Sequence, residues 1–397
     1  MQIKIGPILC QISMNRIIFL SIEAFDRIKN LKYLIGSLSE RGFSTEYWNL
    51  ALLYGFPTSQ PTNDIVVEKQ VESFKDLEFL IKKEDNKDTV FSFIFTYNSK
   101  YYSIVHSLKQ QGFKTVFYAF GFDRVGISAI KISLLERLKM ANFQDAILNR
   151  LTPYLVKIGY IKDFDLVFSP IHQSALKKLN RLLISNKAKF VRVNTPDYEC
   201  YRESLKIKAG GTNNIIVFID QNLPFHPDSK IASFKTVNPK KYYSNLLSFF
   251  SQISKCLGLK VVVAAHPTTD INQVCKYLPG IDIIKGRTAD LVNNASCVIC
   301  HISNAICYPI CNNTPIIFIA DEEVRTFMPL FYAKTKYQAD TIGCKFIDIS
   351  ETHEFEKDDF MHVDIKKYTN YKYSFYTTPQ TEKISNIDIY TQAYQRM

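Results

Sequence analysis

The sequence lacks three motifs that mark common families of α/β enzymes. It contains no Gly-x-Gly-x-x-Gly, no Gly-Lys-Ser/Thr of a phosphate-binding loop and no Gly-x-Ser-x-Gly. The first two hold dinucleotides or nucleoside triphosphates, and the third carries a nucleophilic serine on a sharp turn. A Rossmann dehydrogenase, a P-loop nucleotidase and an α/β-hydrolase are therefore disfavoured.

Long apolar runs are also missing. No stretch of 18 apolar residues occurs, so the sequence predicts no transmembrane helix. Residues 1–13 have no small-residue cleavage site, and we interpret them as a leader before the first strand rather than a signal peptide. Most of the nine cysteines lie in apolar segments, which suits reduced thiols in a cytoplasmic protein.

Metal-ligand patterns are scarce as well. Cys297-x-x-Cys300, with His301, Cys307 and Cys311 nearby, is the single cluster that resembles a metal site. On a strand, however, positions i and i+3 point to opposite faces, so the first two thiols cannot bind one ion. We therefore expect neither a metal nor a bound cofactor.

Acidic residues are outnumbered by basic ones. Lysine and arginine (49) exceed aspartate and glutamate (38), which gives a net charge of +11. Such a balance suits an anionic donor and peripheral contact with an anionic inner membrane, although a solvated basic surface is the simpler alternative. The chain has no nucleic-acid-binding motif, so nucleic acid is not an expected partner.

The first half of the chain alternates strands with helices, which predicts a parallel sheet covered on both faces. The expected strands are 17–23, 45–49, 89–95, 114–119, 166–169 and 190–193. The expected helices are 28–41, 65–83, 100–111, a long periodic stretch over 128–160, and one that ends at 184.

The same alternation restarts after a polar segment, 194–214, that contains Gly210-Gly211. The second set of strands is 215–220, 260–265, 281–284, 297–300, 315–320 and 346–349, with a helix over 239–257. We predict a leader (1–13), a first Rossmann-like domain (14–200), a linker (201–214) and a second such domain (215–350). A tail (351–397) follows, with a closing helix near 382–396 and a return to the first domain as one option.

Polar residues follow the apolar strands of the second half, where parallel sheets bind ligands. His266-Pro267 follows one strand, and His301-Ile-Ser303-Asn304 follows another. A histidine can donate to a phosphate oxygen, and a serine that caps a helix stands beside free backbone amides. We interpret these segments as half of a phosphate-bearing ligand site. An ordinary loop histidine and a simple helix cap are the alternatives.

Five further positions are candidates for the same site. Gln221 and His226 flank the first strand of the second half, and Gly286 and Thr288 follow a short strand where they could reach a nucleoside. Glu322, in Asp-Glu-Glu after another strand, could bind ribose or sugar hydroxyls. Polar turns and a solvated acidic loop are the alternatives.

Asp123 is the first candidate for a general base. It follows the strand 114–119 in an aromatic and glycine-rich turn, from which a carboxylate could take a proton from an acceptor hydroxyl. Glu23, after the first strand, is the second candidate. A helix cap, or an ion pair of Asp123 with Arg124, is the alternative.

Together these features resemble glycosyltransferases of the GT-B architecture, in which two Rossmann-like domains face each other across a cleft. The likeness is greatest to bacterial sialyltransferases and other transferases of CMP-activated acidic sugars. These enzymes place a His-Pro motif and a serine motif on the nucleotide phosphate, which here correspond to His266-Pro267 and Ser303. Asn304 stands where many of them have a second serine or threonine.

The resemblance implies a specific reaction. A CMP-linked sugar, sialic acid-like or Kdo-like, would pass to a bacterial surface glycan or glycolipid. His266 would neutralise the leaving phosphate without a metal, and Asp123 would act as the base for inversion. A CDP-polyol phosphotransferase, a UDP-sugar transferase or epimerase, and a non-enzymatic scaffold of capsule assembly are the alternatives.

Overall fold

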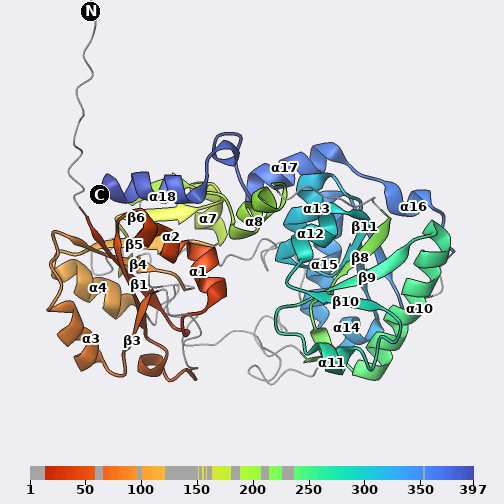
Figure 1. Ribbon diagram of the computed structural model, residues 1–397, viewed down its shortest axis with the longest axis horizontal. Helices are drawn as coiled ribbons and strands as arrows, with labels where there is room; N and C mark the ends of the chain where they lie inside the picture. The colour runs from red at the N-terminus through yellow and green to blue at the C-terminus, as the bar shows by residue number, and fades with distance from the viewer. Residues whose placement is uncertain are drawn as a thin grey trace, which may run out of the picture. The chain divides into compact units, whose positions relative to one another are not determined.

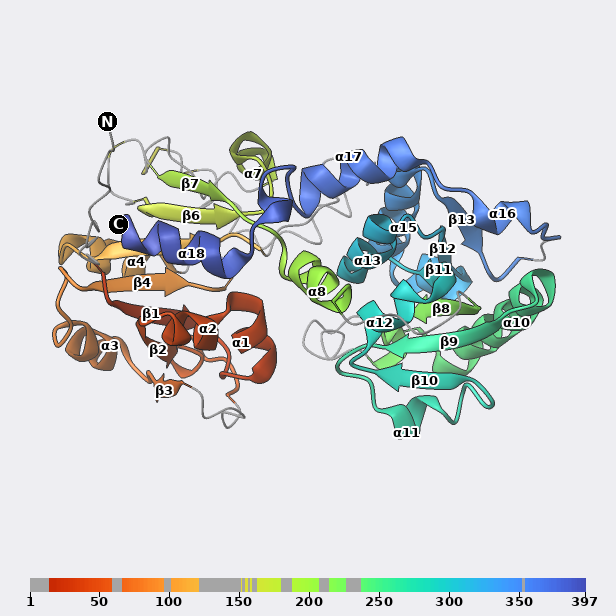
Figure 2. The ribbon, with the colours of Figure 1, turned by 45° about the horizontal axis from the view of Figure 1, so that its top comes forward.

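The protein folds into two compact units, each built on a parallel sheet. The computed structural model describes residues 14–58, 66–95, 101–120, 151, 154–155, 158, 163–179, 188–206, 214–225, 237–351 and 354–397. Among these, unit 1 comprises residues 14–196 and 377–397, and unit 2 comprises residues 197–376. Figures 1 and 2 show helices on both faces of each sheet.

Unit 1 contains a seven-stranded sheet in the order β3-β2-β1-β4-β5-β6-β7, and all neighbouring strands are parallel. The strands are β1 (Arg16–Ser21), β2 (Ser44–Asn49), β3 (Val67–Gln70), β4 (Thr89–Phe93), β5 (Lys114–Tyr118), β6 (Leu166–Ser169) and β7 (Lys189–Arg192). The helices include α1 (Arg27–Tyr33), α2 (Ile35–Glu40), α3 (Phe74–Ile81), α4 (Tyr102–Gln110), α7 (Gln173–Leu179) and α18 (Asn386–Gln395).

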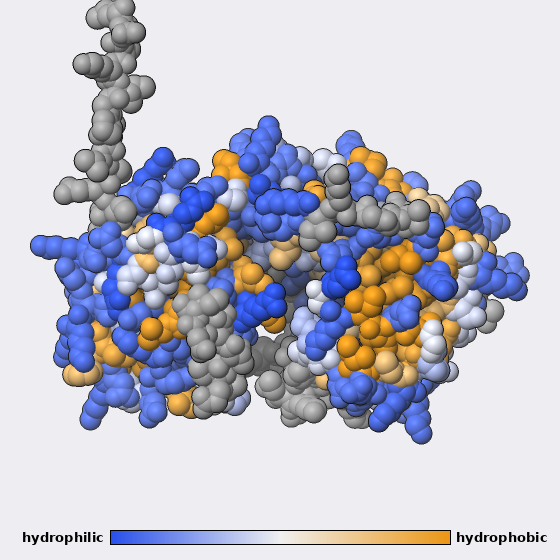
Figure 3. Space-filling view, in the orientation of Figure 1, coloured by the Kyte–Doolittle hydropathy of each residue, from blue (hydrophilic) through white to orange (hydrophobic). Residues whose placement is uncertain are grey.

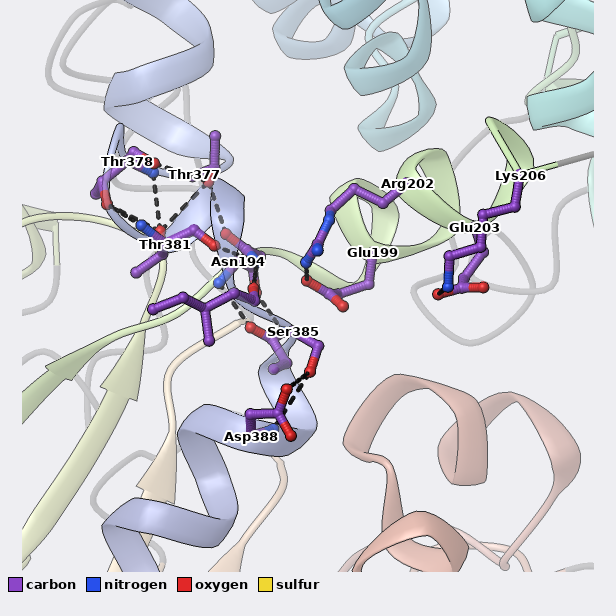
Figure 4. A network of polar contacts seen from close by, with 12 residues as sticks. Asn194, Glu199, Arg202, Glu203, Lys206, Thr377, Thr378, Thr381, Ser385 and Asp388 are labelled. Atoms are coloured by element: carbon purple, nitrogen blue, oxygen red, sulfur yellow. Dashed lines mark hydrogen bonds and ion pairs between the residues drawn. The ribbon is translucent and has the colours of Figure 1, made fainter.

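The C-terminal helix α18 is part of unit 1 and completes its core. Tyr390 and Tyr394 pack against Phe168, and the Tyr394 hydroxyl lies 2.7 Å from the Ser92 Oγ. The segment before α18 is fixed by Asn194, whose side chain donates to the Thr381 and Ile384 carbonyls (Figure 4). Residues far apart in sequence are therefore joined by satisfied buried polar groups rather than by apolar contact alone.

Unit 2 contains a six-stranded parallel sheet in the order β10-β9-β8-β11-β12-β13. The strands are β8 (Ile215–Ile219), β9 (Lys260–Ala265), β10 (Asp282–Lys285), β11 (Ala295–Cys300), β12 (Ile316–Ala320) and β13 (Lys345–Asp348). The main helices are α8 (Pro196–Ser204), α10 (Pro239–Leu257), α11 (Ile271–Val274), α12 (Thr288–Asn293), α13 (Cys307–Asn312), α14 (Glu322–Phe327), α15 (Pro329–Ile342), α16 (Asp358–Met361) and α17 (Ile365–Phe375).

Two separate cores lie on the faces of the unit 2 sheet. One is dominated by α10, which begins at the cap Asn238 with Pro239 in its first turn and ends at Gly258 with φ 67°. The other gathers side chains of α12, α13, α15 and α17. The edge strand β10 leaves Ile283 and Ile284 half-buried, and Figure 3 shows hydrophobic surface over β9 and β10.

The strand-helix alternation is confirmed, with three local differences. The expected helix over 65–83 is confirmed only for α3 (Phe74–Ile81), which Ser73 caps, because Val67–Gln70 forms strand β3 instead. The expected helix over 28–41 divides at Leu34, which has φ 56°. The polar segment expected as a linker contains α8, whose Tyr198 is buried in unit 2. Gly210 and Gly211, residues 1–13 and most of 128–160 lie outside the described residues.

Candidate functional site

The carboxyl ends of β9, β8 and β11 form the candidate site, in unit 2. After β8 the chain continues into β9 on one side of it, and β11 lies on the other side. Such a switch of direction is where open parallel sheets bind ligands. With a strand spacing of about 4.8 Å, the backbones at the ends of β9 and β11 are about 10 Å apart, a span that part of a nucleotide can cover.

Gln221 and Ser303 connect the loops on the two sides of the switch point. The Gln221 side-chain amide donates to the Ser303 Oγ at 3.0 Å. Ser303 also accepts from the Ala305 backbone N–H at 3.2 Å, which makes it the cap of the 3-10 turn Asn304–Ile306 before α13. The serine cap was expected from the sequence. Its bond to Gln221 was not, although both residues were candidates.

His266 lies at the end of β9 in a turn that fixes its ring. The Thr268 backbone N–H donates to the His266 Nδ1 at 3.3 Å, and the Thr268 Oγ lies 2.8 Å from the same nitrogen. The hydrogen-bond pattern assigns the ring proton to Nε2 in the neutral form. A half-buried His266 with a protonated Nε2 can donate a hydrogen bond to an anionic ligand.

The buried carboxylate of Asp220 stabilises this turn through a hydrogen bond. Its side chain is 2% exposed and accepts from the Asn222 backbone N–H at 2.8 Å and from the Thr269 Oγ at 3.2 Å. Burial raises the pKa of Asp220, while these donors act in the opposite direction. Lys285 of β10 adds a bond from its Nζ to the Thr269 carbonyl at 3.0 Å. The Asp220 carboxylate is thus enclosed by the two loops that it joins.

His301 does not reach the surface, in contrast to the expectation that it contacts a ligand. The ring is fully buried, its Nδ1 donates to the Ile319 carbonyl at 2.7 Å, and its Nε2 accepts from the Tyr242 hydroxyl at 2.9 Å. Burial lowers the pKa of His301 to about 4, so the ring is neutral near pH 7. These two hydrogen bonds connect the end of β11 to β12 and α10.

The other candidates differ in what surrounds them. Pro267, Asn304 and Gly286 are exposed, and Gly286 has φ +79°, which favours glycine in that turn. Thr288 opens α12 after the edge strand β10. Glu322 is exposed and pairs with the Lys241 Nζ at 3.0 Å, so its carboxylate already has a cationic partner. Asp123 and His226 lie outside the described residues.

The carboxylates on either side of Glu322 already accept hydrogen bonds from within the fold. Asp321 caps α14 by accepting from the Val324 backbone N–H at 2.9 Å and also accepts from the Asn245 side chain at 3.1 Å. Glu323 accepts from the Asn238 backbone N–H at 2.9 Å. In the described part of the chain, no group of three or more His, Cys, Asp or Glu side chains is arranged to hold a metal ion.

In unit 1, Glu23 follows β1 and pairs with the Lys29 Nζ at 2.8 Å. Lys29 also contacts Asp26, so two carboxylates share one ammonium group. Across the described residues, no helix combines the length and the apolar character that a bilayer crossing requires.

Comparisons with known proteins identify the fold. No family model matches the chain, and no curated protein matches it. The wall teichoic acid polymerase TagF (H444N variant) superposes with a TM-score of 0.52 at 10% identity over 96% of this chain and 89% of that chain. A second TagF structure gives 0.51 at 9% identity over 96% and 88%.

A UDP-GlcNAc 2-epimerase of Methanocaldococcus jannaschii, solved with UDP-GlcNAc and UDP, gives a TM-score of 0.47 at 13% identity over 96% of this chain and 100% of that chain. At these identities, the two TagF likenesses establish the fold alone. They confirm the predicted class: the chain has the glycosyltransferase-like GT-B fold, with two Rossmann-like α/β domains.

Proposed function

We propose that the protein is a transferase that binds a nucleotide-activated donor at the carboxyl edge of the unit 2 sheet. The observation that carries this proposal is the Gln221–Ser303 bond across the switch point, next to a His266 turn fixed by Asp220 and Thr268. His266 would donate its Nε2–H to the donor phosphate and offset the charge that develops as the phosphate leaves.

The proposed donor is a CMP-activated acidic sugar. None of the side chains of His266, Ser303 and Gln221 is permanently charged, and together they suit a single phosphate that leaves as a nucleoside monophosphate. The proposed transfer needs no metal for that reason. Gly286 and Thr288 would contact the nucleoside, with Pro267 and Asn304 shaping the phosphate loops.

A CDP-polyol phosphotransferase or a UDP-sugar transferase is the second candidate. The observation in its favour is the fold shared with TagF, a wall teichoic acid polymerase. A diphosphate would extend the same contacts by one phosphate unit. Either donor is compatible with transfer to a bacterial surface glycan or glycolipid.

We assign the general base to Asp123 and expect inversion. The alternative base, Glu23, already forms an ion pair with the Lys29 Nζ at 2.8 Å. An Asp123→Asn variant should lose at least about 100-fold in turnover, the usual contribution of a positioned base. Full turnover of that variant would remove the assignment.

A cytoplasmic, membrane-peripheral location is proposed from helix α1. Ile28 and Leu31 of this helix are 59% and 57% exposed, and basic residues Arg27 and Lys32 accompany them. Exposed apolar residues among basic ones suit the surface of an anionic membrane.

Binding of nucleotides tests the proposal directly. Thermal stability is measured with CMP, CDP, UDP and GDP, because a ligand at 100 times its Kd stabilises the folded state by about 2.7 kcal/mol. Stabilisation by CMP alone supports the first candidate, and stabilisation by CDP or UDP supports the second. His266→Gln and Ser303→Ala should weaken the response, while His362→Gln, an exposed histidine of unit 2, serves as the control. If no nucleotide stabilises the chain, the non-enzymatic scaffold is favoured instead.

A further inference from the structure

Arg192, at the end of β7 in unit 1, differs from other arginines of the protein. Five arginines hold a carboxylate within ion-pair distance: Arg16, Arg41, Arg202, Arg287 and Arg325. No such pair involves Arg192 among the described residues. Its Nη2 donates to the Pro170 carbonyl at 2.5 Å, and its Nε is buried without a hydrogen-bond partner.

An unsatisfied buried donor on a charged group is unfavourable and needs an explanation. Burial alone lowers the pKa of Arg192, whereas Glu46 and Glu84 raise that of Arg16. The Arg192 guanidinium is half-buried, so an incoming anion could meet it with little further loss of hydration. The Nε is closed to solvent, so a partner from outside the described residues would have to reach the guanidinium through its Nη groups.

Hydrogen bonds hold the loop beside Arg192. Arg192 lies opposite Ser169 in the parallel pair β6–β7, at the carboxyl end of both strands. The buried Ser169 Oγ accepts from the Ile171 backbone N–H and donates to the Ile171 carbonyl, each at 3.2 Å. The Pro170 carbonyl therefore holds Arg192 from a loop that is itself fixed, and a site built there would be preorganised.

His172, two residues beyond Pro170, lies on the same loop and carries a further N–H donor. The Ser174 backbone N–H donates to the His172 Nδ1 at 3.3 Å, and the Ser174 Oγ lies 2.8 Å from it. His266 has the same two contacts with Thr268 at the same distances. In its neutral form the exposed His172 ring thus carries its proton on Nε2, as His266 does.

We propose that the carboxyl edge of β6 and β7 binds a phosphate group of the acceptor, with the Arg192 guanidinium and the His172 Nε2–H as donors. The planar guanidinium is suited to a phosphate oxyanion through paired N–H groups. The assignment to the acceptor rests on the proposed function, in which unit 2 binds the donor. The phosphate site itself does not depend on that function.

The test uses the whole 397-residue chain with inorganic phosphate as the probe in isothermal titration calorimetry. Arg192→Gln should weaken phosphate binding about 10-fold or more, and His172→Gln about 3-fold to 10-fold. Arg41→Gln removes the same charge from an exposed arginine of unit 1 that pairs with Asp388, and should change the affinity less than about 2-fold. Arg192→Lys keeps the charge but loses the planar fork of N–H donors. It should weaken phosphate binding more than Arg41→Gln does and less than Arg192→Gln does.

Several outcomes would overturn the site. They are the absence of phosphate binding by the wild-type protein, equal weakening in Arg41→Gln and Arg192→Gln, or wild-type affinity in a folded Arg192→Lys or Arg192→Gln. Loss of binding in His266→Gln together with retention in Arg192→Gln would assign the phosphate to unit 2. The response to nucleotides, measured on the same samples, should persist in Arg192→Gln. A wild-type protein that binds phosphate but no nucleotide would contradict the proposed donor site in unit 2 and leave the phosphate site in unit 1 standing.

Discussion

The carboxyl edges of the two sheets carry side chains of opposite charge. Under the edge of the unit 2 sheet lies a carboxylate, Asp220, that accepts hydrogen bonds from residues of two loops. At the edge of the unit 1 sheet lies a guanidinium, Arg192, with a buried Nε that has no partner. Each edge also carries a histidine, His266 or His172, oriented by the hydroxyl residue two positions later.

The difference separates a structural charge from a functional one. A buried charge whose bonds are satisfied within the fold contributes to stability, and its removal leaves donors unpaired. A half-buried charge that has no ion-pair partner and one unsatisfied donor costs stability, and it is retained where a ligand binds it. Stability measurements on matched variants can therefore distinguish Asp220 from Arg192.

The largest expected effect is on Asp220. Asp220→Ala should lower the free energy of unfolding of unit 2 by about 2–4 kcal/mol, because the Thr269 hydroxyl and the Asn222 N–H lose their acceptor. Arg192→Gln should change the free energy of unfolding of unit 1 by less than about 0.5 kcal/mol. The measurement is urea unfolding, in which Trp48, the single tryptophan, reports unit 1 and circular dichroism reports both units.

Asp270→Ala is the control for unit 2. Asp270 is exposed and caps α11, so its loss should cost about 1 kcal/mol, as for an ordinary cap. If Arg192→Gln instead destabilised unit 1 as much as Asp220→Ala destabilises unit 2, the proposed contrast between the two edges would be wrong.

The next effect depends on pH and on His301. Its pKa in the folded protein is about 4, below the ordinary value near 6.5, so the unfolded chain binds a proton more readily. Stability therefore falls as the pH decreases from about 6.5 towards 4, and the contribution lost between pH 7 and pH 5 is about 2 kcal/mol. Urea unfolding of unit 2 at both pH values measures it.

His301→Gln should be less stable at pH 7, since the Tyr242 hydroxyl loses part of its contact, but should lack that portion of the pH dependence. A variant with the same pH dependence as the wild type would show that another group is responsible. His172→Gln, at an exposed histidine of unit 1, provides the control variant.

A smaller effect is expected at Thr268. Thr268→Val removes the hydroxyl beside the His266 Nδ1 while it keeps the backbone N–H, so the ring is less firmly oriented. We expect nucleotide affinity to fall about 3-fold to 10-fold, the equivalent of one neutral hydrogen bond. Thr268→Ser should restore the affinity. Equal affinities for all three proteins would mean that the backbone contact alone orients the ring.

Much of the fold was predictable because buried parallel strands are continuous apolar runs bounded by clear breaks. The strand Leu166–Ser169 and the helix Pro239–Leu257 were predicted at their exact ends. The edge strand β3 was missed because its sequence, Val-Glu-Lys-Gln, has a single apolar residue and no buried position, and so matches no apolar template. The packing of α18 on unit 1 depends on long-range contacts that no local pattern contains.

The site was less predictable, because chemistry at a strand end depends on burial. His266 and His301 looked equivalent in sequence, but only the structure distinguishes a half-buried donor from a ring enclosed by Tyr242 and Ile319. His172 and Arg192 were missed altogether. The available signal was the spacing His172-x-Ser174, which repeats that of His266-x-Thr268. The unsatisfied Nε of Arg192 left no trace in the sequence.

The smallest expected effect concerns Glu322, which the sequence suggested as a contact of the donor sugar. Its carboxylate is exposed and shares the Lys241 Nζ with Glu323, at 3.0 Å and 3.2 Å. Exposed pairs of this kind contribute little, so Glu322→Gln should alter the melting temperature by no more than about 1 °C and nucleotide affinity by less than about 2-fold. Ser303→Ala, measured beside it, should weaken nucleotide binding several-fold, since it loses both the Gln221 bond and the cap. A loss of affinity in Glu322→Gln as large as in Ser303→Ala would instead extend the ligand site from β11 to the end of β12.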